Sequence, residues 1–202
     1  RENRLTYDVL DYYLELSKKE SDYLLYEEPM GTVSGVQTQI PVLLSEYQFQ
    51  SKEDVDAYLE LMKTTPDYFN SLIAFEQEKA QKGLFMASYT ADTVIEQCQA
   101  FIDMGDSNYL ISTFVDRIQK LTDLSESEKS DYIQKNAYML QTYVLPAYQQ
   151  LIKTVVELKE SGKNEEGLCY LPNGKEYYEL TVQASTGSAR TVPQLQKLTK
   201  NQ

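Results

Sequence analysis

The 202-residue sequence contains no histidine and no tryptophan, and it has only two cysteines. Without histidine, this chain can form neither a Ser-His-Asp triad nor a Cys-His pair, and it cannot carry the His-Glu-x-x-His helix of zinc peptidases. The two cysteines form no Cys-x-x-Cys pair, so the ligand set of a structural zinc site is missing too. Most hydrolase designs are therefore excluded for these residues, and no catalytic residue or metal ligand is assigned among them.

Basic residues are also in short supply, with 19 Lys and Arg against 31 Asp and Glu, a net charge of −12. A surface of this sign repels a phosphate backbone, which argues against nucleic acid and anionic membranes as partners. No apolar run approaches the ~20 residues that cross a bilayer, so no membrane span is predicted. Hydrophobic residues make up 42% and charged residues 25%, as in a typical folded chain. We therefore expect residues 1–202 to form a single domain.

Loops that hold phosphate or calcium are missing as well. Gly31 and Gly35 lack the Gly-Lys-Ser/Thr that completes a P-loop, and no EF-hand loop occurs. Adjacent acidic residues in so acidic a chain indicate a solvated surface more than a catalytic pair. These pairs are Glu27 and Glu28, Glu53 and Asp54, and Glu165 and Glu166.

Apolar residues recur at helical spacing through most of the sequence, which predicts an all-α fold, a multi-helix lobe. The first helix is expected to present one apolar stripe at steps of four, three and four, made of Leu5, Val9, Tyr12 and Leu16. Ser51 and Thr65 are placed to begin two further helices. The second of these should end at Gly83 and turn its charged side chains to water, namely Glu76, Glu78, Lys79 and Lys82.

The longest predicted helix begins at Ser125 and Glu128, because the Ser-x-x-Glu spacing lets each side chain bond the other's backbone amide. No glycine follows until Gly162, so the helix should run from about residue 126 to about residue 161, or ~50 Å. Pro146 falls inside it. Since proline donates no backbone hydrogen bond and crowds the carbonyl four residues earlier, a kink is predicted there.

Two loop-rich segments, near residues 23–45 and 162–190, interrupt the helical pattern. In the first, prolines and glycines break the period, and an extended stretch is predicted to enter a short helix at Pro41. In the second, the apolar run 168–171 is either a strand or a buried loop. A turn then precedes a helix over about residues 175–184.

Two kinds of side chain leave alternatives open. Cys98 and Cys169 are either two buried free thiols or a disulfide that forms in an oxidising compartment. Most of the seventeen tyrosines should pack helices together with the hydroxyl at the surface. Tyr177 and Tyr178 follow a turn and could instead line a ligand groove.

Five stretches, in this order, resemble the bacterial family called domain of unknown function 885: GVQTQIPVLLSEY, EDVDAYLELMKTTPDYFNSLIAFEQEKAQKGL, VLPAYQQL, GLCYLPNGKEYYELTVQASTGSAR and TVPQLQKL. The likeness covers nearly the whole chain. Its most specific part is residues 167–190, where Leu-Pro-x-Gly is followed by Tyr-Tyr and then by Thr-Gly-Ser. Relatives often have a His-Thr or Thr-Thr pair where this chain has Thr-Gly-Ser. No histidine is therefore assigned to this chain from the resemblance.

That family looks like a branch of the zinc metallopeptidases, largely helical, with a His-Glu motif and a nearby Pro-Gly-His in the later half of a much longer chain. The resemblance therefore implies that residues 1–202 are the N-terminal lobe of a longer protein, with any zinc and the catalytic part downstream. Relatives often look like exported lipoproteins. This implies an extracytoplasmic location, secreted or lipoprotein-anchored, and makes a Cys98 to Cys169 disulfide as expected as two free thiols.

Two classes of function follow. In the first, the lobe forms one wall of a peptide-binding cleft, with Gln37, Tyr177 and Tyr178 as candidate substrate contacts, and is not catalytic alone. In the second, it is a non-enzymatic helical module that binds a peptide or another protein, and its tyrosines mainly pack.

Overall fold

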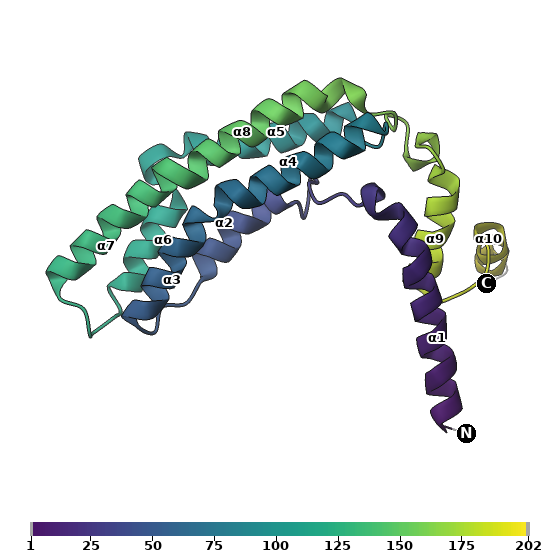
Figure 1. Cartoon of the computed structure of the whole chain (residues 1–202), viewed down its shortest axis with the longest axis horizontal. Coiled ribbons are helices and arrows are strands. Elements are labelled where there is room, and N and C mark those ends of the chain that lie inside the picture. The colour runs from purple at the N-terminus through teal and green to yellow at the C-terminus, as the bar shows by residue number, and fades with distance from the viewer. Residues whose placement is uncertain (1, 201–202) are drawn as a thin grey trace.

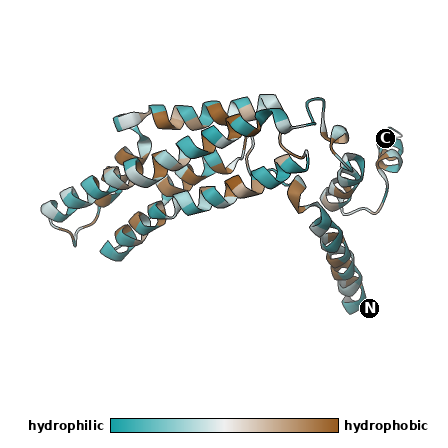
Figure 2. Cartoon of the chain, turned by 45° about the horizontal axis from the view of Figure 1, so that its top comes forward, coloured by the Kyte–Doolittle hydropathy of each residue, from teal (hydrophilic) through white to brown (hydrophobic). Residues whose placement is uncertain are grey.

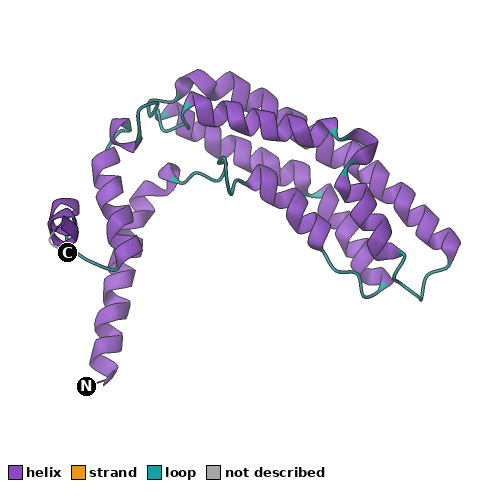
Figure 3. Cartoon of the chain, turned by 180° about the vertical axis from the view of Figure 1, so that it is seen from behind, coloured by secondary structure: helices purple, strands orange, loops and turns teal. Residues whose placement is uncertain are grey.

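The computed structural model describes residues 2–200, and all regular structure in this range is helical, which confirms the all-α prediction (Figure 3). Figure 1 shows an arched bundle of α2 to α8 joined to an arm of α1, α9 and α10. The helices are α1 (Glu2–Glu20), α2 (Val36–Glu46), α3 (Lys52–Lys63), α4 (Thr65–Gln81), α5 (Ser88–Asp103), α6 (Tyr109–Ile118), α7 (Glu126–Met139), α8 (Leu145–Leu158), α9 (Gly174–Thr186) and α10 (Val192–Lys200). Shorter helical turns are η1 (Ser21–Tyr26), η2 (Gly105–Ser107), η3 (Leu140–Val144), η4 (Lys159–Ser161) and η5 (Leu168–Tyr170).

The core lies inside the bundle, where α4 and α5 pack along α8. Many of its largest side chains are aromatic, and some neighbouring rings meet edge to face, an arrangement that adds to their attraction. The rings of Phe69 and Tyr148 lie 4.9 Å apart, and those of Phe49 and Phe114 lie 5.3 Å apart. The fully buried rings come from four different helices and from the α4–α5 loop: Tyr58, Phe69, Phe85, Phe114 and Tyr148.

The long helix expected around Pro146 is present as one curved rod of α7, η3 and α8 (Figure 1). Its irregularity takes the form of a π-helical turn, η3, in which the Leu145 amide bonds the carbonyl of Leu140, five residues earlier. The wider turn suits a proline at the start of α8, where a missing N–H costs least. The α-helix ends at Leu158, three residues short of the expected end, and η4 completes it.

The helix expected to start at Pro41 starts five residues earlier, at Val36, and Pro41 lies inside it. The sequence prediction was wrong here because a proline inside a helix leaves one carbonyl without its partner, the carbonyl of Gln37. In the folded chain the hydroxyl of Tyr148, on α8, donates to that carbonyl at 2.6 Å. The contact across the bundle replaces the lost helical bond.

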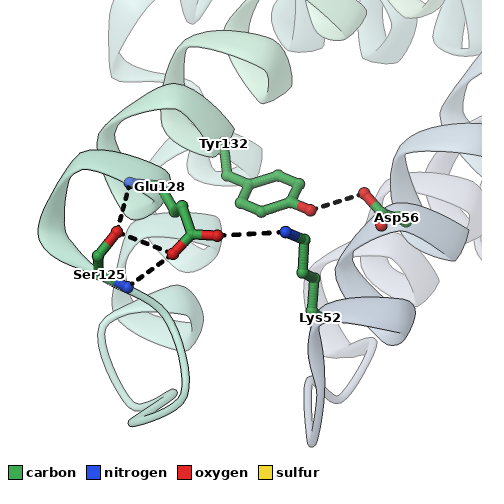
Figure 4. A network of polar contacts seen from close by, with 5 residues as sticks. All are labelled: Lys52, Asp56, Ser125, Glu128 and Tyr132. Atoms are coloured by element: carbon green, nitrogen blue, oxygen red, sulfur yellow. Dashed lines mark hydrogen bonds and ion pairs between the residues drawn. The ribbon is translucent and has the colours of Figure 1, made fainter.

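A polar network ties the start of α7 to α3 (Figure 4). The predicted capping box is confirmed: Ser125 and Glu128 each bond the other's backbone amide. Glu128 also pairs with Lys52 at 3.2 Å, and the Tyr132 hydroxyl donates to Asp56 at 2.8 Å. These bonds fix α7 against α3 at the far end of the bundle from the arm.

The arm consists of α1, η1, α9 and α10, with α9 packed against the later half of α1. Leu16 on α1 and Leu180 on α9 are both buried. The helix expected over 175–184 is confirmed as α9, whereas the apolar run 168–171 is neither a strand nor a fully buried loop, because η5 occupies it. Gly174 is required at this turn, because a Cβ there would lie 1.9 Å from the carbonyl oxygen of Leu168.

Candidate functional site

Gln37 lies in the first turn of α2 and is only 2% exposed. Its amide donates to the carbonyl of Gly31 at 2.7 Å and to the side chain of Gln97 at 2.8 Å. Gln97 in turn donates to the carbonyl of Thr32 at 2.9 Å. Gln37 therefore holds the loop before α2 against α5, and it does not line an open surface.

Tyr177 packs between α9 and η1, in a cluster of three tyrosine rings. Its ring centroid lies 4.7 Å from that of Tyr26 and 5.5 Å from that of Tyr23. Burial, with the nearby carboxylates of Glu27 and Glu28, raises the pKa of Tyr177. Tyr177 therefore packs α9 against η1, the turn that follows α1.

Tyr178, the next residue, is half exposed and lines a hollow of about 450 Å³ between α9 and α10. Cys169, Lys175 and Pro193 line it as well. The structure thus separates the three candidate contacts. Gln37 is inside the bundle, Tyr177 packs where α9 meets η1, and Tyr178 lines the hollow between α9 and α10. Their contact with a substrate stays a prediction.

The two cysteines are both free. Cys98 faces the core from α5 at 1% exposure, and burial raises the pKa of its thiol to about 12. Cys169 is exposed on η5, in the arm. Of the two alternatives that the resemblance left open, the disulfide is not formed in this structure, because one thiol points into the bundle core and the other lies at the surface of the arm.

Two charged residues that the helical pattern predicted to be exposed to solvent form an ion pair, which is buried where the arm meets the bundle. Glu76 and Lys79, on α4, are both at 0% exposure, and their charged atoms lie 3.6 Å apart. The Lys79 ammonium also donates to the carbonyl of Glu27 at 2.7 Å, which fastens the segment after η1 to α4. The expectation failed because this segment folds over the face of α4 that the helical pattern assigned to solvent.

The same pair creates an unusual electrostatic environment. Burial raises the pKa of Glu76 to about 7; the charge of Lys79 acts in the opposite direction, and that of Glu28 adds to the rise. Both carboxylate oxygens of Glu76 are buried without a hydrogen bond. A carboxyl group in such surroundings takes up a proton near neutral pH.

Two apolar hollows lie side by side along α4 and form the clearest candidate site, which we call the α4 groove. The first, of about 450 Å³, is lined by Leu24, Glu27, Pro29, Tyr68, Ser71, Leu72 and Phe75. The second, of about 200 Å³, is lined by Ile40, Leu43, Leu61, Thr64, Thr65 and Tyr68. Tyr68 belongs to both hollows. Sequence reasoning missed the groove because its walls come from η1, α2, α3 and α4, and only the tertiary fold brings them together.

No metal site is evident in the part of the chain that the structure describes. Among residues 2–200, no three His, Cys, Asp or Glu side chains cluster in a way that could hold a metal ion. The residues present therefore do not fit the zinc that the resemblance implies for a longer protein. Within the same range no helix has the length and apolar character of a membrane span.

Comparisons with known proteins place these features in a family. A solved structure, described as "the putative lipoprotein from Colwellia psychrerythraea", matches with a TM-score of 0.78 and 18% identity. The match covers 82% of this chain but 29% of that chain, so this chain spans less than a third of its length. No curated protein matches the sequence. The family model described as "Bacterial protein of unknown function (DUF885)" matches residues 1–202, and the chain therefore belongs to the DUF885 family.

Proposed function

We propose that this chain is the N-terminal helical lobe of a longer, exported, zinc metallopeptidase-like protein. In this proposal the lobe forms one wall of a peptide-binding cleft and is not catalytic alone. Zinc and the catalytic groups come from the C-terminal part of the same protein. The observation that carries the proposal is the surface of α1, where most apolar side chains are exposed and only Leu16 is buried.

Most apolar side chains of α1 face solvent. Leu16 is buried, but Leu5 is 69% exposed, and a second stripe of Tyr7, Leu10 and Leu14 is 57–70% exposed. Figure 2 shows hydrophobic colour recurring along the length of α1. A helix with so wide an apolar arc is normally covered on more than one side. The arm is thus shaped to pack against further protein.

The comparison with the Colwellia psychrerythraea structure supports a longer protein. That chain is more than three times the length of the part matched here. The description of that protein as a lipoprotein supports the proposed export of this one. In the proposal, the C-terminal part packs on α1 and faces the α4 groove across the cleft.

The lobe's own residues would bind and orient a peptide without taking part in bond breaking. The groove offers apolar walls, and apolar burial gives most of the binding free energy in peptide sites. Orientation of a bound peptide is itself a large part of catalysis by a neighbouring site. These roles need no histidine in the lobe.

A peptide-library assay tests the proposal. Residues 1–202 and the protein extended beyond Gln202 in its own reading frame are each incubated with zinc and then with a chelator. We expect zinc-dependent cleavage by the extended protein and none by residues 1–202. Cleavage by residues 1–202 would overturn the proposal that this lobe is not catalytic alone. If an extended protein that carries the His-Glu motif cleaves no peptide, the peptidase assignment is overturned.

The alternative is a non-enzymatic helical module that binds a peptide or a protein. One observation favours it: the α4 groove is complete within the described residues, since α4, α3, α2 and η1 supply its walls. The reading frame after Gln202 separates the two functions. A His-Glu motif followed by a further histidine supports the peptidase lobe, and a stop codon supports the module.

A further inference from the structure

The α4 groove has the form of two neighbouring side-chain pockets. Tyr68, which is 48% exposed, stands between them and belongs to both. Each hollow also has an exposed leucine on its rim, Leu24 on the first and Leu43 on the second, both 62% exposed. Because these leucines are already exposed in the folded chain without a ligand, a ligand can cover them without any rearrangement of the fold.

The spacing of the hollows indicates the conformation of the ligand. The α4 residues that line the first hollow are centred about five residues beyond those of the second, which at 1.5 Å per residue is about 7.5 Å. Side chains two residues apart in an extended peptide point to the same side and lie about 7 Å apart. Those four apart in a helix lie about 6 Å apart, and those seven apart about 10.5 Å. The extended form is the closest match.

Two hydroxyl groups in the groove favour the same conformation. The Thr64 hydroxyl donates to the carbonyl of Leu61 at 2.8 Å, and the Ser71 hydroxyl donates to the carbonyl of Asp67 at 3.1 Å. Thr64 lines the second hollow and Ser71 the first. Each oxygen keeps a lone pair that can accept a further bond. An extended peptide has free N–H groups to donate, whereas a helical peptide has used its own.

Charge indicates which peptides are attracted. The chain carries a net charge of −12, and Glu27 lines the first hollow. A field of this sign raises the association rate of cationic ligands and repels anionic ones. Lysine or arginine beside the apolar residues would therefore strengthen binding.

The groove is held in place before any ligand arrives. Lys79 fixes the segment after η1 to α4 through the carbonyl of Glu27. The bond from Tyr148 to the carbonyl of Gln37 fixes α2, which carries the wall of the second hollow. A site built on fastened helices loses little conformational entropy on binding.

We propose that the α4 groove binds an extended, basic peptide segment whose alternate apolar side chains enter the two hollows on either side of Tyr68. The inference rests on the proposed function in taking a peptide as the ligand, and it adds the conformation, the spacing and the charge. It does not require cleavage.

Fluorescence polarisation with residues 1–202 tests the inference. The probe is the labelled nonapeptide Gly-Lys-Lys-Leu-Ser-Leu-Lys-Lys-Gly, in which the leucines alternate. The composition-matched control, Gly-Lys-Lys-Leu-Leu-Ser-Lys-Lys-Gly, sends its leucines to opposite sides of an extended chain. We expect the alternating probe to bind at least about tenfold more tightly, since burial of one leucine side chain is worth that much or more. The glutamate counterpart of the probe should bind more weakly still.

Substitutions at the rim locate the site. Leu24→Asp and Leu43→Asp, both at exposed positions, should each weaken binding of the probe at least about tenfold, because each places a charge at the mouth of one hollow. Val33→Asp is the matched control, because Val33 is 90% exposed and lies outside both hollows. Circular dichroism of each variant confirms that it is folded.

The outcomes separate this inference from the proposed function. Equal affinity for the two peptides, tighter binding of a peptide whose leucines stand four apart, or no effect of either rim variant would overturn the groove assignment. Cleavage by the extended protein that is unaffected by Leu24→Asp and Leu43→Asp would leave the peptidase proposal standing without the groove. Specific binding without any cleavage by the extended protein would retain the groove and remove the peptidase.

Discussion

The hydroxyl of Tyr148 donates a hydrogen bond of 2.6 Å to the backbone carbonyl of Gln37, 111 residues away in the sequence. The carbonyl is free because residue 41 is a proline, which has no N–H to return to it. One side chain on α8 thus repairs the helical ladder of α2 and fastens α2 to the centre of the bundle. Since α2 forms a wall of the α4 groove, the same bond supports the candidate site.

Tyr148→Phe should lower the free energy of unfolding by about 1–3 kcal/mol. The phenyl ring fills the same space, but the carbonyl of Gln37 is left buried without a partner. Urea unfolding followed by circular dichroism measures the loss. Tyr138→Phe, at a position 59% exposed, is the control and should be nearly neutral.

A double-mutant cycle makes this prediction specific. Pro41→Ala restores an N–H that can bond the carbonyl of Gln37 within α2. In that background Tyr148→Phe should cost less than it does in the natural chain, and the difference is the coupling free energy. Equal losses in the two backgrounds would show that the carbonyl of Gln37 does not depend on Tyr148.

The burial of Glu76 gives stability an unusual dependence on pH. Because its pKa is raised from 4.5 to about 7, the folded chain holds this proton more tightly than the unfolded chain. The stabilisation is fully present below pH 4.5 and is lost as the pH rises through about 7. The shift corresponds to a loss of the order of 3 kcal/mol, at about 1.4 kcal/mol for each pH unit.

Glu76→Gln removes this titration while keeping the shape of the side chain. Relative to the natural chain, its free energy of unfolding should rise between pH 4 and pH 8, which urea unfolding at a series of pH values measures. Glu78→Gln is the matched control on the same helix, because Glu78 is 55% exposed and pairs with Lys82 at the surface. A flat difference for Glu76→Gln, like that expected for the control, would mean that Glu76 is ionised normally.

The free cysteines predict a simple labelling pattern. In the folded chain a maleimide reagent should label Cys169 alone, because Cys98 is buried and its pKa of about 12 keeps it protonated. After unfolding without reductant, both thiols should react. Cys169→Ser should show no label while folded. If no thiol reacts in the unfolded, unreduced chain, the two cysteines are bridged and this assignment is wrong.

Local signals in the sequence account for much of the fold. The capping box of Ser125 and Glu128 and the glycine-free stretch after it predict the long rod, since both act through bonds to near neighbours. The start of α2 could not be found in this way. The carbonyl that Pro41 leaves free is bonded by Tyr148, and that partner is 111 residues distant.

The candidate site was harder to predict for the same reason. Leu24, Leu43 and Tyr68 look unremarkable one at a time, and only the approach of η1, α2 and α4 makes them walls of one groove. Glu76 and Lys79 have the spacing of a solvated ion pair on a helix, and the helical pattern gives no sign of the segment that covers them. Gln37 and Tyr177 were singled out by residue type and loop position, and both proved to have structural partners.

In the proposed function, the lobe is one part of a longer protein, and the rest of that protein packs on α1. Hydroxyl-radical footprinting compares the solvent access of Tyr7, Leu10 and Leu14 in residues 1–202 with that in the protein extended beyond Gln202. We expect strong oxidation of this stripe in residues 1–202 and marked protection in the extended protein, with Tyr138 equally reactive in both. Equal oxidation of the α1 stripe in the two proteins would contradict the packing on α1.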